Sequence, residues 1–571
     1  STYDKGTADV SLAPNFLDKH LTLNLNAKGV YTYSNYADSG VIGNAAFFNP
    51  TQDPYFRNED GTIDYTTTNG FFNYGNGRGE NFAPNTLLGV GPMSQLYDRI
   101  SFGTSRRFVG SAGFDYKVHG FEALKFNVTA CLDWSDYNNK NGVEVGSYQA
   151  WSDTENRGVG QYSKEWQLRK SSALEAYVNY NETWGVHNLD VMAGYSWQHF
   201  FGSNRTMNYF NVTDELKLNE GETADKRYPT WKWESYLVSF YGRINYSIAS
   251  KYLFTFSLRN DGSSRFSPET RWGLFPSGAF AWNIGAEDFL KDSKALSQLK
   301  LRLSAGMTGQ QDGIGEYAHL SRYGLSTDVY HQQFMGDAGW SFMWTPGAYD
   351  PNIKWETTTT YNVGVDFGFL GDRITGNVDA YLRNTDDLLN SVLTPMGCTF
   401  CNTVITNVGS MQNKGFEVTL DLVPVQKKNF TWNMNFNIAV NRNKVTALTN
   451  DQYSLLRSVS WDQRFNAQYP YITQVGKPSG MMYGFIYEGT YKPEEFNAGG
   501  TSLKDGIAYM TSVGQDKVRP GDPKYRDINK DGLIDDNDRT VIGCGQPLHT
   551  GGFGNTCNFY GFDLNVFFSW S

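Results

Sequence analysis

The sequence has no long apolar run and no concentration of basic residues, and each of these two shortages removes a class of protein. No stretch approaches the roughly 20 apolar residues of a transmembrane helix, so a membrane helix is excluded whereas a membrane strand is not. The net charge of -10, with no basic patch interleaved with aromatic residues, argues against a nucleic-acid partner. The first residues, "STYDKGTADV", lack both the basic and the apolar region of a signal peptide.

Domain boundaries are also missing from the sequence. A soluble chain of 571 residues would normally divide into two or more cores, because a single core stops growing at about 300 residues. Here no Pro/Ser-rich linker, low-complexity tract or charge block marks a division, and 59 glycines and many aromatic residues are spread along the whole length. Because this composition favours strands and turns, we expect one all-β domain over residues 1–571.

Catalytic motifs are absent from the sequence. The seven histidines form no H-E-x-x-H pair, and no G-x-x-x-x-G-K-[ST] loop is present to hold a phosphate. Asp386 and Asp387 could serve a hydrolase, but adjacent acidic residues are common on exposed loops, which is the interpretation we favour. We therefore expect that the protein is not an enzyme.

The sequence does contain a repeated alternation of apolar and polar residues. In "FTWNMNFNIAVN", which begins at Phe430, the even-numbered positions are apolar and most odd-numbered ones polar, as in a strand with two different faces. Each such segment has about ten residues, enough to span a bilayer at a tilt of about 45°, and only a closed barrel satisfies the backbone of spanning strands. The pattern therefore predicts an antiparallel transmembrane β-barrel. Further segments of this kind begin at Leu21, Leu124, Leu189, Tyr252, Leu299 and Arg373.

The connections between the predicted strands are either short or long. Tight turns are expected around His119 and Gly120 and in the segments "TWGVHN", "IASK" and "LGD". Bacterial outer-membrane barrels show this asymmetry, with short periplasmic turns and long extracellular loops. We count about fifteen strands, and because such barrels have even numbers and the chain stops within the strand "DLNVFFSWS", we expect a part of a larger barrel. The long connections are expected from Ala37 to Arg106, from Gln310 to Glu356 and from Lys444 to His549.

The last long connection contains a dense acidic segment, "DINKDGLIDDND" (Asp527 to Asp538). Two carboxylates about 4 Å apart repel each other by roughly 4 kcal/mol at an effective dielectric constant near 20, so the segment needs a counter-charge. Its spacing fits the D-x-[DN]-x-[DN]-G calcium-loop pattern, with Gly532 at the sharp turn. The predicted calcium ligands are the side chains of Asp527, Asn529, Asp531, Asp535 and Asp538 and the carbonyl group of Leu533.

This loop departs from calcium sensors in two respects. Asp538 stands where the pattern has a longer glutamate, which indicates weak binding in the roughly 10⁻⁴ to 10⁻³ M range of extracellular sites. Gly521 and Pro523 forbid a helix leading into the loop. An Asx-rich surface turn without a metal is the alternative interpretation.

Two of the five cysteines, Cys398 and Cys401, form C-T-F-C in an expected extracellular loop. Because no second C-x-x-C and no histidines at zinc spacing are nearby, a small disulfide is favoured over a zinc site. Cys544 and Cys557 could also pair, whereas Cys131 falls on the polar face of its strand.

The long connections are rich in aromatic residues, which stack on sugar rings and on peptide side chains. Tryptophan and tyrosine also form girdles at the interfaces of membrane barrels, so tryptophans at strand ends have a structural explanation. "GWSFMWTPG" lies far from any predicted strand end, and its Trp340 and Trp344 are therefore the candidate ligand-binding residues. The other aromatic residues assigned to long connections are Trp151, Trp231, Trp233, Tyr330 and Phe334.

Six segments carry a family resemblance. They are "LRNDGSSRFSPETRWGLFPSGAFAWNI", "SAGMTGQQDGIGEY", "DPNIKWETTTTYNVGVDFGFL", "NVGSMQNKGFEV", "GDPKYRDINKDGLIDDNDRTVIG" and "GGFGNTCNFYGFDLNVFF". In this order they resemble SusC-like TonB-dependent transporters of Bacteroidota, from about Leu21 to the last residue. The resemblance implies a 22-stranded barrel in the outer membrane, with an N-terminal plug that has no counterpart in this sequence. It also implies energy supplied through the TonB complex and a SusD-like lipoprotein that caps the barrel outside.

Three functions are consistent with these features of the sequence. The resemblance favours active import of oligosaccharides or peptides, and the residues do not separate these two cargoes. A passive porin or adhesin barrel is the main alternative, and a surface enzyme anchored by a barrel is the third. A folded plug with a TonB-contacting segment would exclude a passive pore.

Overall fold

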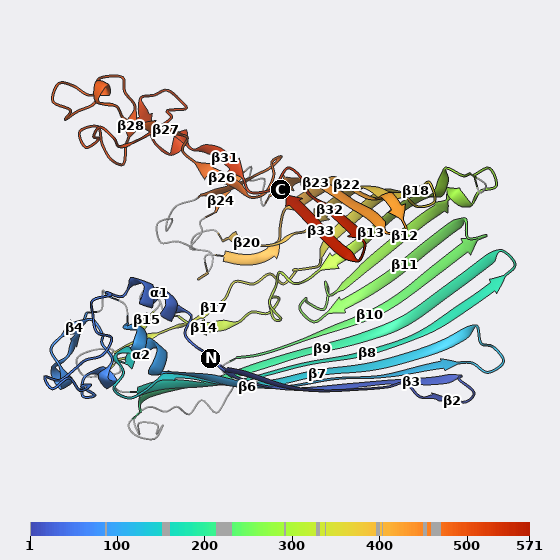
Figure 1. Ribbon diagram of the computed structural model, residues 1–571, viewed down its shortest axis with the longest axis horizontal. Helices are drawn as coiled ribbons and strands as arrows, with labels where there is room; N and C mark the ends of the chain where they lie inside the picture. Colours follow the sequence, from blue (N-terminus) through green and yellow to red (C-terminus); the bar gives the residue numbers. More distant parts are fainter. Residues whose placement is uncertain are drawn as a thin grey trace. The chain divides into compact units, whose positions relative to one another are not determined.

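A large antiparallel sheet dominates the computed structural model of the chain (Figure 1). The structure describes residues 2–571 except 86–87, 89, 151–159, 213–230, 291–292, 327–331, 337–338, 395–399, 402, 449–453 and 458–469. Within that part, seventeen strands belong to the sheet. They are β1 (Thr2–Leu12), β2 (Asn15–Phe16), β3 (Leu21–Asn35), β6 (Arg99–Lys117), β7 (Leu124–Val143), β8 (Gly160–Trp184), β9 (His187–Val212), β10 (Trp231–Ile248), β11 (Tyr252–Ser263), β12 (Trp272–Asn283), β13 (Leu296–Gln310), β18 (Glu356–Phe369), β19 (Ile374–Asp386), β22 (Ser410–Lys427), β23 (Phe430–Ala447), β32 (Thr550–Phe559) and β33 (Phe562–Trp570).

The chain divides into two compact units. Unit 1 comprises Ser1–Asn181, Met192–Tyr241 and Asp261–Ser264, and unit 2 comprises Glu182–Val191, Gly242–Asn260 and Arg265–Ser571. The α-helices of the described residues are the short α1 (Gly40–Phe47) and α2 (Pro92–Tyr97), both in unit 1. No helix in that part of the chain has the length and apolar character needed to cross a membrane.

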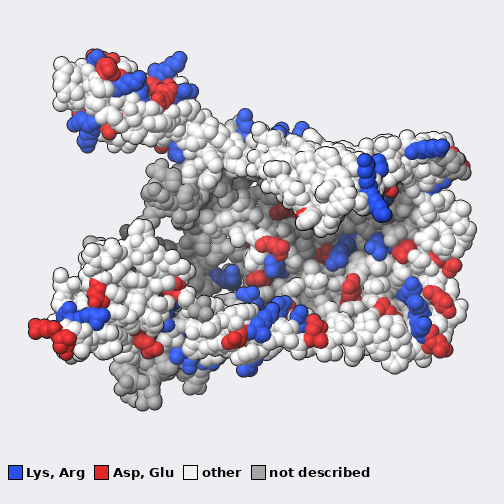
Figure 2. Space-filling view, in the orientation of Figure 1, with Lys and Arg blue, Asp and Glu red and all other residues white. Residues whose placement is uncertain are grey.

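Alternating residues give the sheet of unit 2 an apolar face and a polar face, as the sequence predicts. Because successive side chains of a strand point to opposite faces, two adjacent cross-strand rows define the faces. The row on the apolar face consists of Val365, Val378, Val418 and Ile438 on β18, β19, β22 and β23. The row on the polar face consists of Asp366, Asn377, Thr419 and Asn437. Figure 2 shows how few charged residues cover β32 and β33 of the same unit.

The polar face of unit 2 carries a cluster of ion pairs. Arg302 Nη2 lies 2.8 Å from Asp366 Oδ1 and 2.9 Å from Asp379 Oδ2. Gly364 lies between Arg302 and Asp379 in the same cross-strand row, and a Cβ atom at this position would clash with both side chains. Glycine at position 364 therefore leaves the room that the bidentate arginine needs.

Unit 1 shows the same alternation. Leu25, Ala112, Ala130 and Leu174 form an apolar row across β3, β6, β7 and β8. The adjacent row on the polar face consists of Asn26, Ser111, Cys131 and Ala173. This register confirms that Cys131 belongs to the polar face. An ion pair of 2.6 Å between Arg107 and Asp133 lies on the same face.

The strand ends confirm the predicted contrast between short and long connections. Short turns occupy 118–123, 185–186, 249–251 and 370–373, at the four positions expected from the sequence. In the two-residue turn between β32 and β33, Tyr560 and Gly561 both have positive φ angles (46° and 87°), as a type I′ hairpin turn requires. The long connections span 36–98, 311–355 and 448–549. We call the two ends of the strands the short-turn end and the long-connection end.

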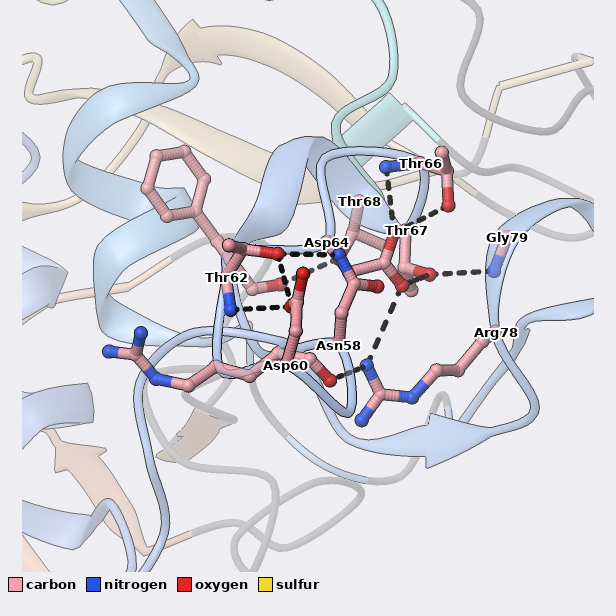
Figure 3. A network of polar contacts seen from close by, with 11 residues as sticks. Asn58, Asp60, Thr62, Asp64, Thr66, Thr67, Thr68, Arg78 and Gly79 are labelled. Carbon is pink, nitrogen blue, oxygen red and sulfur yellow. Dashed lines mark hydrogen bonds and ion pairs between the residues drawn. The ribbon is translucent and has the colours of Figure 1, made fainter.

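The connection 36–98 is ordered by polar side chains (Figure 3). Asp64, which is almost fully buried, accepts hydrogen bonds from the hydroxyl groups of Thr66 and Thr67. Arg78 Nη1 lies 3.5 Å from the second carboxylate oxygen of Asp64. Because these polar groups form hydrogen bonds and an ion pair with one another, they connect parts of a segment that contains little secondary structure.

The connection 448–549 contains a small folded segment with its own apolar core, in which Figure 1 labels β27 and β28. At its base, β26 (Met481–Gly484) pairs with β31 (Thr540–Cys544), so that Met481 lies opposite Cys544. The core side chains are at most 4% exposed and comprise Tyr491, Phe496, Leu503 and Val518. The other strands of this connection are β24 (Ser454–Arg457), β25 (Tyr471–Gln474), β27 (Tyr487–Thr490), β28 (Tyr509–Met510), β29 (Pro523–Tyr525) and β30 (Leu533–Ile534).

The sheet begins earlier than the sequence pattern indicates. The alternation is first apparent at Leu21, but β1 (Thr2–Leu12) already pairs with β3 along its whole length. Its polar positions are not regular, since Thr2, Asp4 and Gly6 alternate with Tyr3, Lys5 and Thr7. The extended strand is therefore stabilised by its partner rather than indicated by its own pattern.

Candidate ligand-binding and metal-binding segments

The connection 311–355 forms two short ladders that expose aromatic side chains. In one ladder, β15 (Gln332–Phe334) pairs with β16 (Trp340–Phe342), and Phe334 lies opposite Trp340 with ring centroids 5.5 Å apart. Trp340 is 68% exposed and Phe334 is 65% exposed. The ring pair therefore leaves most of its surface available to a ligand.

The second ladder presents Trp344 in a similar way. β14 (Tyr323–Leu325) pairs with β17 (Trp344–Pro346), which puts Trp344 opposite Leu325. Tyr323 and Leu325 share a face because they are two residues apart, and Trp344 is 65% exposed. Exposed aromatic faces of this kind stack on sugar rings and on apolar or aromatic peptide side chains.

Polar contacts join the end of the connection 311–355 to a neighbouring hairpin, β20 (Leu389–Leu393) and β21 (Thr403–Asn407). The Asn407 side chain accepts a hydrogen bond from the Lys354 amide (2.8 Å) and donates to the Lys354 carbonyl (2.8 Å). It also donates to the carbonyl group of Asp387 at 2.9 Å. Asn407 thus holds the residue range just before β18 against the residues that follow β19, a contact that no sequence motif indicated.

Other aromatic residues assigned to long connections lie elsewhere. Trp231 and Trp233 belong to β10, which corrects their assignment to a loop. The Trp233 indole packs where a Cβ atom of Gly202 would be, so glycine on the neighbouring strand makes room for the ring. Trp151 and Tyr330 lie outside the described residues.

The acidic segment Asp527–Asp538 forms a series of turns closed by its own side chains. Asp527 accepts hydrogen bonds from the amides of Lys530 (2.6 Å) and Gly532 (2.9 Å). Asp531 accepts from the Leu533 amide (2.8 Å), and Gly532 has a φ angle of 85° that suits glycine. These are Asx turns, in which backbone amides stabilise the carboxylate charges.

Asp538 ties the two ends of the acidic segment together. Its side chain is fully buried, and its oxygens accept hydrogen bonds from the amides of Ile528 (2.7 Å), Asn529 (3.4 Å) and Asp535 (3.0 Å). Although burial alone would raise the pKa of Asp538, these amide hydrogen bonds hold the pKa below its usual value. Both oxygens of Asp538 are therefore engaged by the backbone.

The fit of a calcium ion to this segment depends on which oxygens remain available. Among the residues that the structure describes, no group of three or more His, Cys, Asp and Glu side chains is placed to hold a metal ion. The predicted ligand set also includes the Asn529 amide and the Leu533 carbonyl, which are oxygen donors of the kind that calcium prefers. The calcium site therefore stays a prediction.

Comparison with known proteins decides the family. The family model described as "TonB dependent receptor-like, beta-barrel" matches residues 47–524. The chain belongs to this family. TonB-dependent receptors are β-barrels of the outer membrane, so the predicted all-β barrel class and the outer-membrane location are confirmed.

Named relatives of this TonB-dependent receptor support the SusC-like resemblance. The chain is 38% identical over 465 residues to the TonB-dependent receptor SusC of Bacteroides thetaiotaomicron, a match that covers 79% of this chain and 44% of SusC. It is 32% identical over 434 residues to the TonB-dependent receptor P3 of Formosa agariphila, covering 75% of this chain and 41% of P3. The chain thus spans less than half the length of these relatives.

A solved structure shares the fold of this TonB-dependent receptor. The RagAB peptide transporter superposes with a TM-score of 0.75 at 20% identity, over 99% of this chain and 57% of the matched chain. The likeness at this identity concerns the fold, which is the long-stranded sheet described above.

The cysteines of the receptor chain are only partly described. Cys398 lies outside the described residues, so a disulfide with Cys401 stays a prediction. The Cys401 sulfur lies 3.3 Å from the amide nitrogen of Ala348 and 3.6 Å from the carbonyl oxygen of Pro346, next to the base of the aromatic ladders. Cys544 and Cys557 are free thiols, which corrects the suggestion that they pair.

Proposed function

We propose that the protein to which this chain belongs imports a ligand across the outer membrane with energy from the TonB complex. The observation that carries the proposal is the 38% identity to SusC over 79% of the chain. The role is transport rather than catalysis, because the family is one of receptors and the candidate residues are aromatic rather than nucleophilic or acid–base groups.

We propose further that a SusD-like lipoprotein covers the long-connection end. In outer-membrane barrels the long loops are extracellular, which puts the aromatic ladders and the acidic segment at the surface where such a lid would dock. The proposed cargo is an oligosaccharide or a peptide. Stacking on Trp340 and Trp344, which are 68% and 65% exposed, supports both cargoes equally.

For the acidic segment we propose a structural calcium ion that orders the extracellular loop. Its ligands would be the side chains of Asp527, Asn529, Asp531, Asp535 and Asp538 and the Leu533 carbonyl. When bound, the ion supplies positive charge to a segment that holds five aspartates between residues 527 and 538. The chain's own contribution is to hold these oxygens in turns through the amide hydrogen bonds described above.

Uptake measurements in the native bacterium test the transport proposal. Cells that produce the protein are offered labelled oligosaccharides and labelled peptides, with and without a functional TonB complex. We expect uptake of one cargo class that is lost when TonB is inactivated, and co-purification of a lipoprotein in mild detergent. Equal uptake without TonB would instead support the passive porin, and surface attachment without uptake would support the adhesin.

A further inference from the structure

A groove crosses the apolar face of unit 2. It is shallow, has a volume of about 670 Å³ and exposes mainly apolar atoms, although Thr255, Ser304 and Asn362 are among its lining residues. Gly278 and Ala305 lie opposite each other in one cross-strand row of β12 and β13 and form its floor. The walls consist of Phe254, Phe256, Phe280, Leu303, Tyr361 and Val363.

The row that contains the groove floor leads to a pair of basic residues. From Ala305 the register continues through Tyr361 and Leu382 to Lys414 and then Arg442. Neighbouring strands are about 4.8 Å apart. Lys414 is two strands away from Tyr361 in the groove wall, so the two residues are separated by roughly 10 Å along the row.

A third basic residue, Lys444, shares this face because it lies two residues after Arg442 on β23. Lys414, Arg442 and Lys444 are all exposed. Asp386, in the same part of the apolar face, carries the opposite charge. The surface next to the groove is therefore net positive, and we call these three residues the basic cluster.

The position of the basic cluster indicates the level of the lipid headgroups. A lysine or arginine on the lipid-facing side of a barrel costs roughly 2–4 kcal/mol at the bilayer midplane and about 0–1 kcal/mol near the interface. Lys414 is the fifth residue from the start of β22, and Lys444 precedes the end of β23 at Ala447. Both therefore lie toward the long-connection end, where the strands leave the hydrocarbon.

We propose that the groove and the basic cluster form one binding site for lipid A, the phosphorylated lipid of the outer leaflet. An acyl chain lies in the groove over Gly278 and Ala305, and a phosphate group lies between Lys414 and Lys444. Phosphate oxygens form charge-assisted hydrogen bonds with ammonium groups, and apolar burial holds the chain. This site on the outer wall is separate from the import function, because it is on the face opposite to the polar face of the sheet.

Native mass spectrometry of the full-length protein, purified from outer membranes in mild detergent, tests the site. The probes are lipid A, dephosphorylated lipid A and phosphatidylglycerol, each added at the same concentrations. We expect saturable binding of lipid A. Lys414→Gln combined with Lys444→Gln should weaken it roughly 10- to 30-fold, because each basic residue near a lipid surface contributes about 1 kcal/mol.

Two further variants separate the site from general effects on the protein. Lys427→Gln with Lys428→Gln removes two lysines from the short-turn end of the same hairpin and should leave lipid A binding unchanged. Gly278→Leu should weaken it at least fivefold by filling the groove. A Cβ atom at this glycine would meet only the Thr255 carbonyl oxygen, 3.9 Å away, so the backbone need not move.

The proposal is contradicted if the double variant Lys414→Gln and Lys444→Gln binds lipid A as the native protein does. It is also contradicted if dephosphorylated lipid A or phosphatidylglycerol binds as strongly as lipid A, because the phosphate or the lipid class would then be irrelevant. Folding of each variant is checked by the heat-dependent change in electrophoretic mobility, so that loss of binding is interpreted only for intact barrels.

Discussion

Replacing Ile438 by arginine tests whether the apolar face of the sheet contacts lipid and the polar face lines the barrel interior. Ile438 lies at the centre of β23 (Phe430–Ala447), between Val418 on β22 and Gly551 on β32. A guanidinium group at this depth would have to enter the hydrocarbon, at a cost of about 2–4 kcal/mol in the free energy of unfolding.

The adjacent residue supplies a matched control. Asn437 lies between Thr419 and Gly552 in the polar row, so an arginine there would point away from lipid. We expect Asn437→Arg to cost less than about 1 kcal/mol, as for a substitution outside the lipid-facing surface. The two variants add the same charge, and they differ only in which of two adjacent positions carries the arginine.

Urea unfolding of the protein reconstituted in lipid vesicles, followed by tryptophan fluorescence, measures both effects. The urea concentrations at the unfolding midpoint are compared only between variants with the same m value, because a changed m value would indicate a different extent of unfolding. We expect a clear loss for Ile438→Arg and a small one for Asn437→Arg. Equal losses, or a larger loss for Asn437→Arg, would refute the assignment of the apolar face to lipid.

Three other predictions concern the long connections. Trp340→Ala or Trp344→Ala should weaken cargo binding by about 1 kcal/mol, roughly fivefold, without changing barrel yield; unchanged affinity in both variants, measured by calorimetry, would leave these rings a structural role. Calcium should increase hydrogen-exchange protection of residues 527–538 relative to chelator, an effect lost in Asp531→Ala; equal protection in all four samples would favour the metal-free Asx turn. Because the pKa of Asp538 is lowered in the folded protein, its carboxylate stabilises this loop above the usual pKa of about 3.9 and the contribution disappears as pH falls through the lowered value. Hydrogen exchange between pH 6 and pH 3 should therefore show acid-induced opening in the native chain, and a loop in Asp538→Asn that is already less protected at pH 6 by about 1.5–3 kcal/mol; a pH-independent loop in the native chain would contradict this role.

The sheet was predictable from the sequence where alternation was uninterrupted. The segment at Phe430 predicted a strand of twelve residues, and β23 begins at Phe430 and continues to Ala447. The tight turns were likewise located correctly, since turns of two to six residues fix the pairing register. The first long connection was expected to reach Arg106 but ends at residue 98, because β6 already begins at Arg99. The limits of β23 were missed because Arg442 and Lys444 on the apolar face break the pattern near the interface.

Other elements were set by tertiary contacts that leave no local pattern. β1 pairs with β3 although its own residues alternate poorly. Trp233 was assigned to a long connection, and only the neighbouring Gly202 shows that the ring packs on the sheet. The role of Asn407 depends on Lys354, which is 53 residues away in the chain, a separation that no motif encodes.

The candidate site was partly predictable for a similar reason. Trp340 and Trp344 were selected because they lie far from any predicted strand end, whereas the short strands that they begin and their partners Phe334 and Leu325 came from the structure. In the acidic segment the motif identified the turn at Gly532, but not that Asp538 would be buried and saturated by amides. Calcium and amides compete for the same oxygens, and spacing alone does not decide between them.

The folded segment within 448–549 has a consequence for how the last strands reach the sheet. β32 pairs with β23 across about one hundred residues. The entropic cost of closing a flexible loop increases with the logarithm of its length. Pairing of Met481 with Cys544 removes roughly sixty residues from the loop. If that segment forms first, the entropic barrier to docking β32 and β33 falls by about 1 kcal/mol, which speeds assembly roughly fivefold. The folded segment would then act during biogenesis as a folding aid for the hairpin of β32 and β33, before it meets any ligand.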